Sequence, residues 1–305
     1  MIQRMIVVAA LALAGFGASA QAASFDCADR ARGDGAVVTV ETTLAGVPAI
    51  VRMPKVVTRA PIVLWHGFGP PASESALAEA LPLDDVPAIK VYLGMPLFGK
   101  RAEPGGIEAL KRRQDADVAL QVFEPIVAGA AKELPAVVAA LRADHCVKRG
   151  ERIGLFGFSA GGASALYALA ERKVPIGAAI VLNASTGLSA SVAAYEHATG
   201  KKYAWSEAAR ELARRTDAVG RARDIARGDP PPALLIVQGT KDTLLTPELA
   251  TALDAALAPL YKGQDADREQ LVLLDGLSHN VTDAAAIDDL RRRIGAWFNR
   301  YLDAS

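Results

Sequence analysis

The sequence predicts an α/β protein with a mostly parallel central sheet that is covered by helices on both faces. Short apolar runs of strand length alternate with longer helix-like segments along most of the 305 residues. Continuous apolar runs are typical of parallel strands, because such strands are buried on both faces of the sheet. Apolar residues make up 51% of the chain, so a sizeable core is expected.

The expected elements begin with a strand pair. Residues 36–43 and 47–53 have β-type side chains and are separated by a turn at Ala45-Gly46. Further strands are expected at 61–65, 88–92, 153–156, 176–182, 233–237 and 270–274. Helices are expected at 114–142, 160–171, 246–260 and 284–302. Pro125 and Pro135 lie within the first of these helices and are expected to break or kink it.

The first 22 residues have the three-part layout of a secretory signal peptide. A basic residue, Arg4, precedes an apolar stretch over residues 5–16, and small residues of the A-x-A type follow up to Ala22. The alternative is a retained membrane anchor, but the apolar stretch is shorter than the ~20 residues that span a bilayer. We therefore expect cleavage, one domain over residues 23–305, no stable membrane insertion, and a periplasmic or secreted protein.

Composition argues against several classes of function. Lys and Arg number 34 and Asp and Glu number 34, which gives a formal net charge of zero. No basic run interleaved with aromatic residues is present, so nucleic-acid binding is not expected. No spacing of Cys and His resembles a metal site, and neither a metal nor an organic cofactor is expected.

The two cysteines, Cys27 and Cys146, are expected to form a disulfide if the protein is exported. The bridge would close a loop of over 100 residues, which the simplest chain-entropy model values at ~4–5 kcal/mol. The alternative is a pair of buried, reduced thiols, because spacing alone does not supply the geometry of a disulfide.

A short motif follows the strand expected at 153–156: Gly157-Phe158-Ser159-Ala160-Gly161, which is G-x-S-x-G. Glycines two positions on either side of a serine fit a tight strand-to-helix turn, in which bulkier side chains would collide. Such a turn lifts the hydroxyl of Ser159 clear of the sheet and aims the amide of Ala160 into the same space. The alternative is a loose turn without a chemical role.

Two more candidate residues, Asp242 and His279, each come shortly after an expected strand. Taken separately, Asp242 could be a turn residue and His279 a solvated loop residue. Together with Ser159 they supply a nucleophile, a base and a carboxylate that orients the base, which is the set that acyl transfer requires. Of the other histidines, we expect His66 to have a structural role and His145 and His197 to lie on the surface.

The chain resembles the α/β-hydrolase superfamily over nearly all of residues 23–305. The resemblance rests on HGFG at 66–69, GFSAG at 157–161, GTKD at 239–242 and the SH pair at 278–279, with the triad in the order Ser, Asp, His. Within this superfamily, the chain is most similar to secreted bacterial esterases and to prolyl-oligopeptidase-like hydrolases. Both have a helical insert before the strand that presents the acid. The counterpart here is residues 185–229, which either cap the pocket or only pack against the domain.

The segment His66-Gly67-Phe68-Gly69 follows a strand at the position where this architecture places an oxyanion donor. We assign that donor to the backbone N–H of Phe68, paired with the N–H of Ala160. Phe68 replaces a glycine of the lipase pattern HGGG. A bulky side chain near the acyl pocket argues against a lipase.

The predicted function is a serine hydrolase that cleaves small-molecule carboxylic esters through an acyl-enzyme. An exopeptidase or amidase with the same triad is the first alternative, and it needs a site for a peptide terminus. The second is an exported binding protein that has kept the fold without the reaction. No separate propeller domain is expected within these 305 residues, which argues against a large oligopeptidase. A serine at residue 159, where dehalogenases and epoxide hydrolases have a carboxylate, argues against those reactions.

Overall fold

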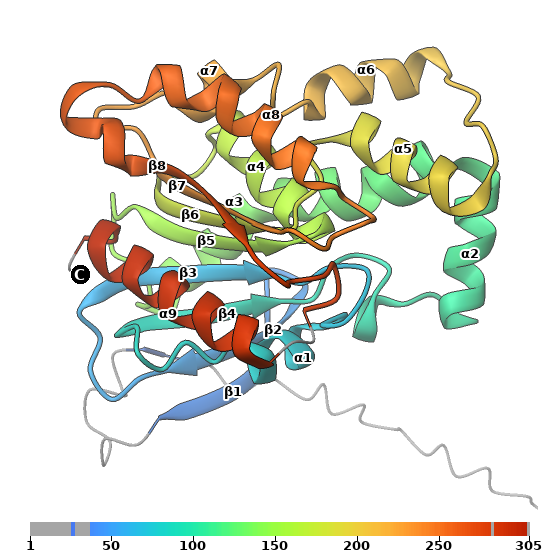
Figure 1. Ribbon diagram of the computed structural model, residues 1–305. Coiled ribbons are helices and arrows are strands. Elements are labelled where there is room, and N and C mark those ends of the chain that lie inside the picture. Colours follow the sequence, from blue (N-terminus) through green and yellow to red (C-terminus); the bar gives the residue numbers. More distant parts are fainter. Residues whose placement is uncertain (1–25, 28–36, 282–283, 304–305) are drawn as a thin grey trace, which may run out of the picture.

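The computed structural model describes residues 26–27, 37–281 and 284–303. Its centre is an eight-stranded sheet in the order β1-β2-β4-β3-β5-β6-β7-β8 (Figure 1). The strands are β1 (Val38–Leu44), β2 (Val47–Met53), β3 (Arg59–Trp65), β4 (Ala88–Leu93), β5 (Ile153–Phe158), β6 (Ile176–Leu182), β7 (Ala233–Gly239) and β8 (Glu269–Leu274). The pairs β1–β2 and β2–β4 are antiparallel, and all other neighbours are parallel. The predicted mostly parallel sheet is confirmed.

The register of the parallel strands brings their carboxyl ends to one edge of the sheet. Phe158 at the end of β5 pairs with Leu182 at the end of β6. Likewise, Gly239 at the end of β7 pairs with Leu274 at the end of β8. The segments that follow β5, β7 and β8 contain the three members of the predicted triad, so they start from the same edge.

Helices cover both faces of the sheet. They are α1 (Glu74–Ala80), α2 (Gly106–Asp117), η3 (Val118–Ala128), α3 (Gly129–Ala143), α4 (Ala160–Glu171), α5 (Leu188–Thr199), α6 (Glu207–Thr216), α7 (Ala222–Ile225), α8 (Pro247–Leu257) and α9 (Ala284–Tyr301). Alternate residues of a strand point to opposite faces. In β3, Val63 and Trp65 pack in a core with η3, α3, α4 and α8, whereas Ile62 and Leu64 pack in a second core with α1 and α9.

The helix predicted over residues 114–142 is interrupted once, at Asp117, whose backbone is extended (φ −164°, ψ 97°) and whose carboxylate accepts hydrogen bonds from the amides of Ala119 and Leu120. It consists of the end of α2, the π-helical segment η3 and α3. Pro125 lies inside η3 and Pro135 inside α3, and neither residue ends a helix. A proline removes only one backbone hydrogen bond. Burial of apolar side chains on both sides of Pro135, including Leu134 and Val137, keeps α3 intact, so the break that was expected at the prolines is absent.

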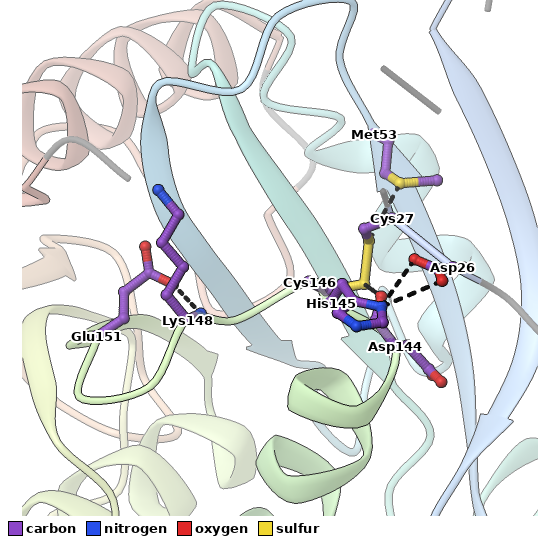
Figure 2. The surroundings of a disulfide bond; sticks show 8 residues. All are labelled: Asp26, Cys27, Met53, Asp144, His145, Cys146, Lys148 and Glu151. Atoms are coloured by element: carbon purple, nitrogen blue, oxygen red, sulfur yellow. Dashed lines mark hydrogen bonds and ion pairs between the residues drawn. A yellow bond between two sulfur atoms is a disulfide. The ribbon is translucent and has the colours of Figure 1, made fainter. Parts of the chain in front are cut away.

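Cys27 and Cys146 are joined by a disulfide (Figure 2). The backbone N–H of Cys27 donates to the carbonyl oxygen of Asp144 at 2.9 Å. Next to the bridge, a carboxylate oxygen of Asp26 lies 3.1 Å from Nδ1 of His145 (Figure 2). The disulfide therefore ties residues 26–27 to the end of α3.

The predicted signal peptide, residues 1–22, lies outside the described residues. In the part of the chain that is described, no helix has both the length and the apolar composition needed to cross a bilayer.

The predicted insert, residues 185–229, lies between β6 and β7 and contains α5, α6 and α7. Ser206 is the N-cap of α6, where its side chain accepts a hydrogen bond from the amide of Ala209 at 3.1 Å. This is the usual way for a serine to satisfy an amide at a helix start.

Candidate active site

Ser159 lies at the turn between β5 and α4. Its backbone has φ +54° and ψ −114°, a conformation that is strained for a residue with a side chain. A Cβ on Gly157 would lie 2.2 Å from the carbonyl oxygen of Gly161, and one on Gly161 would lie 2.5 Å from the carbonyl oxygens of Trp65 and His66. Both positions therefore require glycine, which explains the G-x-S-x-G motif.

The turn brings Ser159 to His279. Oγ of Ser159 lies 3.1 Å from Nε2 of His279, and Nδ1 of His279 lies 2.7 Å from Oδ2 of Asp242. When Nδ1–H donates to the carboxylate, Nε2 can accept the hydroxyl proton of the serine, which is the tautomer that a general base needs. The three residues singled out from the sequence thus form one hydrogen-bonded chain.

Asp242 is held by several donors. It is buried, and its Oδ1 accepts hydrogen bonds from the amides of Leu244 and Leu245, both at 2.9 Å. Its Oδ2 also accepts from Nε2 of the buried Gln238 at 3.3 Å. Such donors stabilise a carboxylate away from bulk water. The nearby Asp275 is exposed and accepts from a threonine hydroxyl instead.

Asn183, directly after β6, is a site residue that the sequence reasoning missed. Its Nδ2 donates to the carbonyl oxygens of Ser278 and His279, at 2.9 and 3.3 Å, and its Oδ1 accepts from the amide of Gly239 at 2.8 Å. The side chain is fully buried and the backbone has φ +43°. Asn183 therefore connects the loop of the histidine to the strand that leads to Asp242. The only sequence signal is a polar residue that closes an apolar strand.

The predicted oxyanion donors lie beside Ser159. A Cβ on Gly67 would lie 2.9 Å from Cβ of Ser159, so the loop 66–69 passes directly beside the serine. Phe68 and Ala160 line the same pocket as Ser159. Among the described residues, no group accepts a hydrogen bond from the amide of Phe68 or Ala160. Both amides are therefore available for an oxyanion.

The side chain of His66 supports the loop of residues 67–69. Its Nδ1 donates to the carbonyl oxygen of Gly67 at 2.8 Å, and its Nε2 accepts from the amide of Met95 at 3.2 Å. Burial lowers the pKa of His66 to about 4, so the ring is neutral at pH 7. The ring of Phe98 packs edge-on against the rings of His66 and Phe68, with centroid distances of 5.5 and 5.1 Å. Segment 94–101 thus contacts the loop of residues 66–69 through Met95 and Phe98.

A pocket of about 260 Å³ opens beside Ser159. Its walls come from η3 and α5, through Val118, Val122, Phe123, Ser191, Ala194, Tyr195 and Ala198. Phe68 and Leu244 form part of its rim and are 39% and 42% exposed. Apart from the imidazole of His279 and the phenol of Tyr195, none of the described residues that line this pocket has an ionisable side chain. Such a lining suits a neutral, apolar group.

No group of three or more His, Cys, Asp and Glu side chains in the described residues could hold a metal ion. The two histidines assigned to the surface, His145 and His197, are both exposed.

The sequence profile of the prolyl oligopeptidase family matches residues 129–305. This segment includes β5 to α9 and with them Ser159, Asp242 and His279. No curated protein sequence matches the chain.

Several solved structures share the fold at low sequence identity. A protein of Thermus thermophilus is 18% identical, with a TM-score of 0.61 over 86% of this chain and 98% of that chain. An esterase of Pyrococcus furiosus is 17% identical, with a TM-score of 0.58 over 87% of this chain and 91% of that chain. An acylaminoacyl peptidase of Pyrococcus horikoshii is 16% identical, with a TM-score of 0.59, and the match covers 88% of this chain and 42% of that chain. These likenesses establish the fold.

Proposed function

The chain belongs to the prolyl oligopeptidase family and is a serine hydrolase with the α/β-hydrolase fold, and we propose that it cleaves neutral carboxylic esters through an acyl-enzyme on Ser159. The observation that supports an ester is the pocket beside Ser159, which has no acidic side chain, lysine or arginine among its described lining residues. Burial of a charge without a partner is costly. A substrate with a free peptide terminus is therefore disfavoured.

The first half of the reaction forms the acyl-enzyme. Oγ of Ser159 attacks the ester carbonyl carbon while Nε2 of His279 takes the hydroxyl proton. Asp242 stabilises the imidazolium through Nδ1–H. The amides of Phe68 and Ala160 bind the tetrahedral oxyanion, and loss of one such donor typically costs ~3–4 kcal/mol in the barrier. The imidazolium then protonates the alcohol as the C–O bond breaks.

The second half releases the acid. A water molecule occupies the space left by the alcohol and gives its proton to Nε2 of His279 as it attacks the acyl carbon. The same two amides bind the second oxyanion. Collapse of this intermediate returns the proton to Oγ of Ser159 and frees the carboxylic acid.

The test compares p-nitrophenyl acyl esters with p-nitroanilides of amino acids that have a free amino group. We expect kcat/KM for the esters to exceed that for the anilides by at least 10³-fold. A fluorophosphonate probe should label the wild type, and Ser159→Ala should abolish both labelling and turnover while circular dichroism stays unchanged. A protein that prefers the free aminoacyl anilides, or labelling that persists in Ser159→Ala, would contradict the proposal.

A second candidate function is an amidase that acts on N-blocked peptides. The neutral pocket favours a blocked terminus over a free one, and one structural neighbour is an acylaminoacyl peptidase. An amide leaving group requires protonation by His279 before the C–N bond breaks. N-acetylated aminoacyl anilides separate the candidates, because an esterase should cleave them far more slowly than an ester with the same acyl group.

Export and the role of the insert belong to the same proposal. We propose that residues 1–22 are removed and that the protein works in the periplasm or outside the cell, where a disulfide such as Cys27–Cys146 is stable. We also propose that residues 185–229 act as a cap, a role that α5 supports because its residues line the pocket. Mass spectrometry of the protein purified from its native host should give an N-terminus at residue 23.

A further inference from the structure

A second cleft lies at the amino ends of β6 and β7, on the opposite edge of the sheet from Ser159. It has a volume of about 470 Å³. Four cationic residues line it, namely Arg152, Arg172, Lys173 and Arg227, together with one acidic residue, Asp229. The chain as a whole has no net charge, so this local excess of three positive charges is not a general property of the surface.

The cleft is separate from the proposed active site. Ile176, the first residue of β6, lines the cleft. Leu182, the last residue of β6, accepts a hydrogen bond from the amide of Ser159. A strand of this length spans roughly 20 Å. A ligand in the cleft would therefore not touch the triad, and the inference does not depend on the ester chemistry.

The four cations have no partner of opposite charge in the part of the chain that is described. No carboxylate oxygen of the described residues lies within 4 Å of the charged nitrogens of Arg152, Arg172, Lys173 or Arg227. By contrast, the nearby Arg221 is paired with two carboxylates. Burial lowers the pKa of Arg152. The like charges of Arg268 and Arg172 add to this effect, and the charge of Asp303 opposes it. An anion in the cleft would offset this repulsion.

Two of the guanidinium groups are held in position by backbone oxygens. Arg152 donates from Nη2 to the carbonyl oxygens of Ile176 and Pro230, at 3.0 and 3.1 Å. Arg172 donates from Nη1 to the carbonyl oxygen of Arg227. These bonds orient the groups without neutralising them. In the described residues, Nη1 of Arg152 has no acceptor, so this edge of the guanidinium remains available to a ligand.

We propose that this cleft binds a compact oligophosphate anion. Arginine guanidinium groups match the oxygens of phosphate in a bidentate geometry. A single carboxylate would leave most of the local positive charge unpaired, whereas a chain of two or three phosphates can engage several of the cations together. The ligand is a small molecule that carries two or three linked phosphates and is free in solution.

The test is calorimetric titration of the full-length mature protein with tripolyphosphate at 50 mM salt. The double variant Arg172→Gln/Arg227→Gln should bind at least 10-fold more weakly than the wild type. A matched control, Arg214→Gln/Arg292→Gln, removes two exposed arginines that are ion-paired on α6 and α9, and it should bind within twofold of the wild type. Arg227→Gln alone should weaken binding at least threefold. It removes no side-chain hydrogen bond among the described residues, so it separates lost binding from misfolding.

Two further measurements identify the chemical class of the ligand and whether it is free or part of a lipid. Citrate should bind at least 10-fold more weakly than pyrophosphate, which has about the same net charge near neutral pH, and flotation with phosphatidylglycerol vesicles shows whether a lipid headgroup is also accepted. The proposal is overturned if tripolyphosphate gives no saturable heat, if citrate binds equally well, if the control variant loses as much affinity, or if only vesicles bind. The double variant should hydrolyse p-nitrophenyl esters at the wild-type rate. The phosphate-binding proposal and the esterase proposal can thus be tested separately.

Discussion

At the scale of single residues, the proposed site depends on how the base is oriented. Asp242 contacts His279 through Oδ2, while two amides and Gln238 hold the carboxylate. The serine is strained, with φ +54°, and close backbone contacts at Gly157 and Gly161 hold it there. The chemistry therefore rests on a rigid turn and on a rigid acid, with the imidazole between them.

The substitution Asp242→Asn is expected to lower kcat for an ester by about 10⁴-fold. An amide at this position donates to Nδ1 and leaves the proton on Nε2, so His279 cannot act as a base. Initial rates at saturating p-nitrophenyl ester measure the effect. Asp275→Asn is the matched control and should stay within twofold of the wild type. A larger loss in the control than in Asp242→Asn would assign the acid to Asp275.

The substitution Asn183→Ala tests whether this asparagine positions the triad. It removes the bonds to the loop of His279 and to Gly239. A small displacement of a catalytic group can cost up to about 10²-fold in rate. We expect kcat to fall 10- to 100-fold with little change in KM. Asn183→Ala with a lower melting temperature but wild-type kcat would show that Asn183 is only a structural residue.

At the scale of elements, α5 determines the width of the pocket. Ala194 lines the pocket from α5, and the adjacent Ala193 is exposed and does not. Ala194→Phe is expected to lower kcat/KM for octanoyl esters at least 10-fold while acetyl esters change less than twofold. Ala193→Phe places the same side chain on the same helix and should change neither. Equal losses on both ester lengths in Ala194→Phe would show that α5 does not select the acyl chain.

A carboxyl pair between α8 and β8, in which Glu269 is buried and Asp254 half-buried, predicts a pH dependence of stability. Burial raises the pKa of Glu269 to about 7, and the charge of Asp254 contributes. Oε1 of Glu269 is buried and has no hydrogen-bond partner among the described residues. Because the folded state binds the proton more tightly than the unfolded state, the stabilisation is complete below about pH 4.5 and is lost as the pH rises through 7.

The corresponding test is urea unfolding of Glu269→Gln and the wild type at pH 5 and pH 8. The wild type should lose roughly 3 kcal/mol at most over this range from this group, and Glu269→Gln should lose clearly less. Glu108→Gln, at an exposed position on α2, should behave as the wild type does. Identical pH dependence in all three proteins would mean that Glu269 does not titrate in this range.

Strands were easier to predict than the elements between them. The buried runs of β3, β5, β6 and β7 are apolar over nearly their whole length, and such a pattern needs no tertiary information. The π-helical register of η3 and the wall that α5 forms were not predictable, because both depend on packing against distant segments. Asn183 was missed for the same reason. Its bonds reach residues 56 to 96 positions away.

At the scale of the whole molecule, the sheet separates two kinds of surface. Its carboxyl edge carries Ser159 and a neutral pocket, and its amino edge carries the basic cleft. The disulfide also lies away from Ser159, since Cys146 precedes β5 and Ser159 follows it. β5 spans roughly 20 Å. Changes at the amino edge should therefore affect binding and stability without changing the catalytic geometry.

The disulfide provides the test of this separation. Cys27 and Cys146 are 119 residues apart, and the chain-entropy model values a loop of this size at ~4–5 kcal/mol. The double variant Cys27→Ser/Cys146→Ser is expected to lose ~2–5 kcal/mol of unfolding free energy in urea while kcat/KM for esters stays within twofold. The wild type treated with a reductant is the control, because it should match the variant without any substitution. A variant that keeps the unfolding free energy of the wild type but loses ester hydrolysis would contradict this prediction. Such a result would show that the amino edge of the sheet affects the triad.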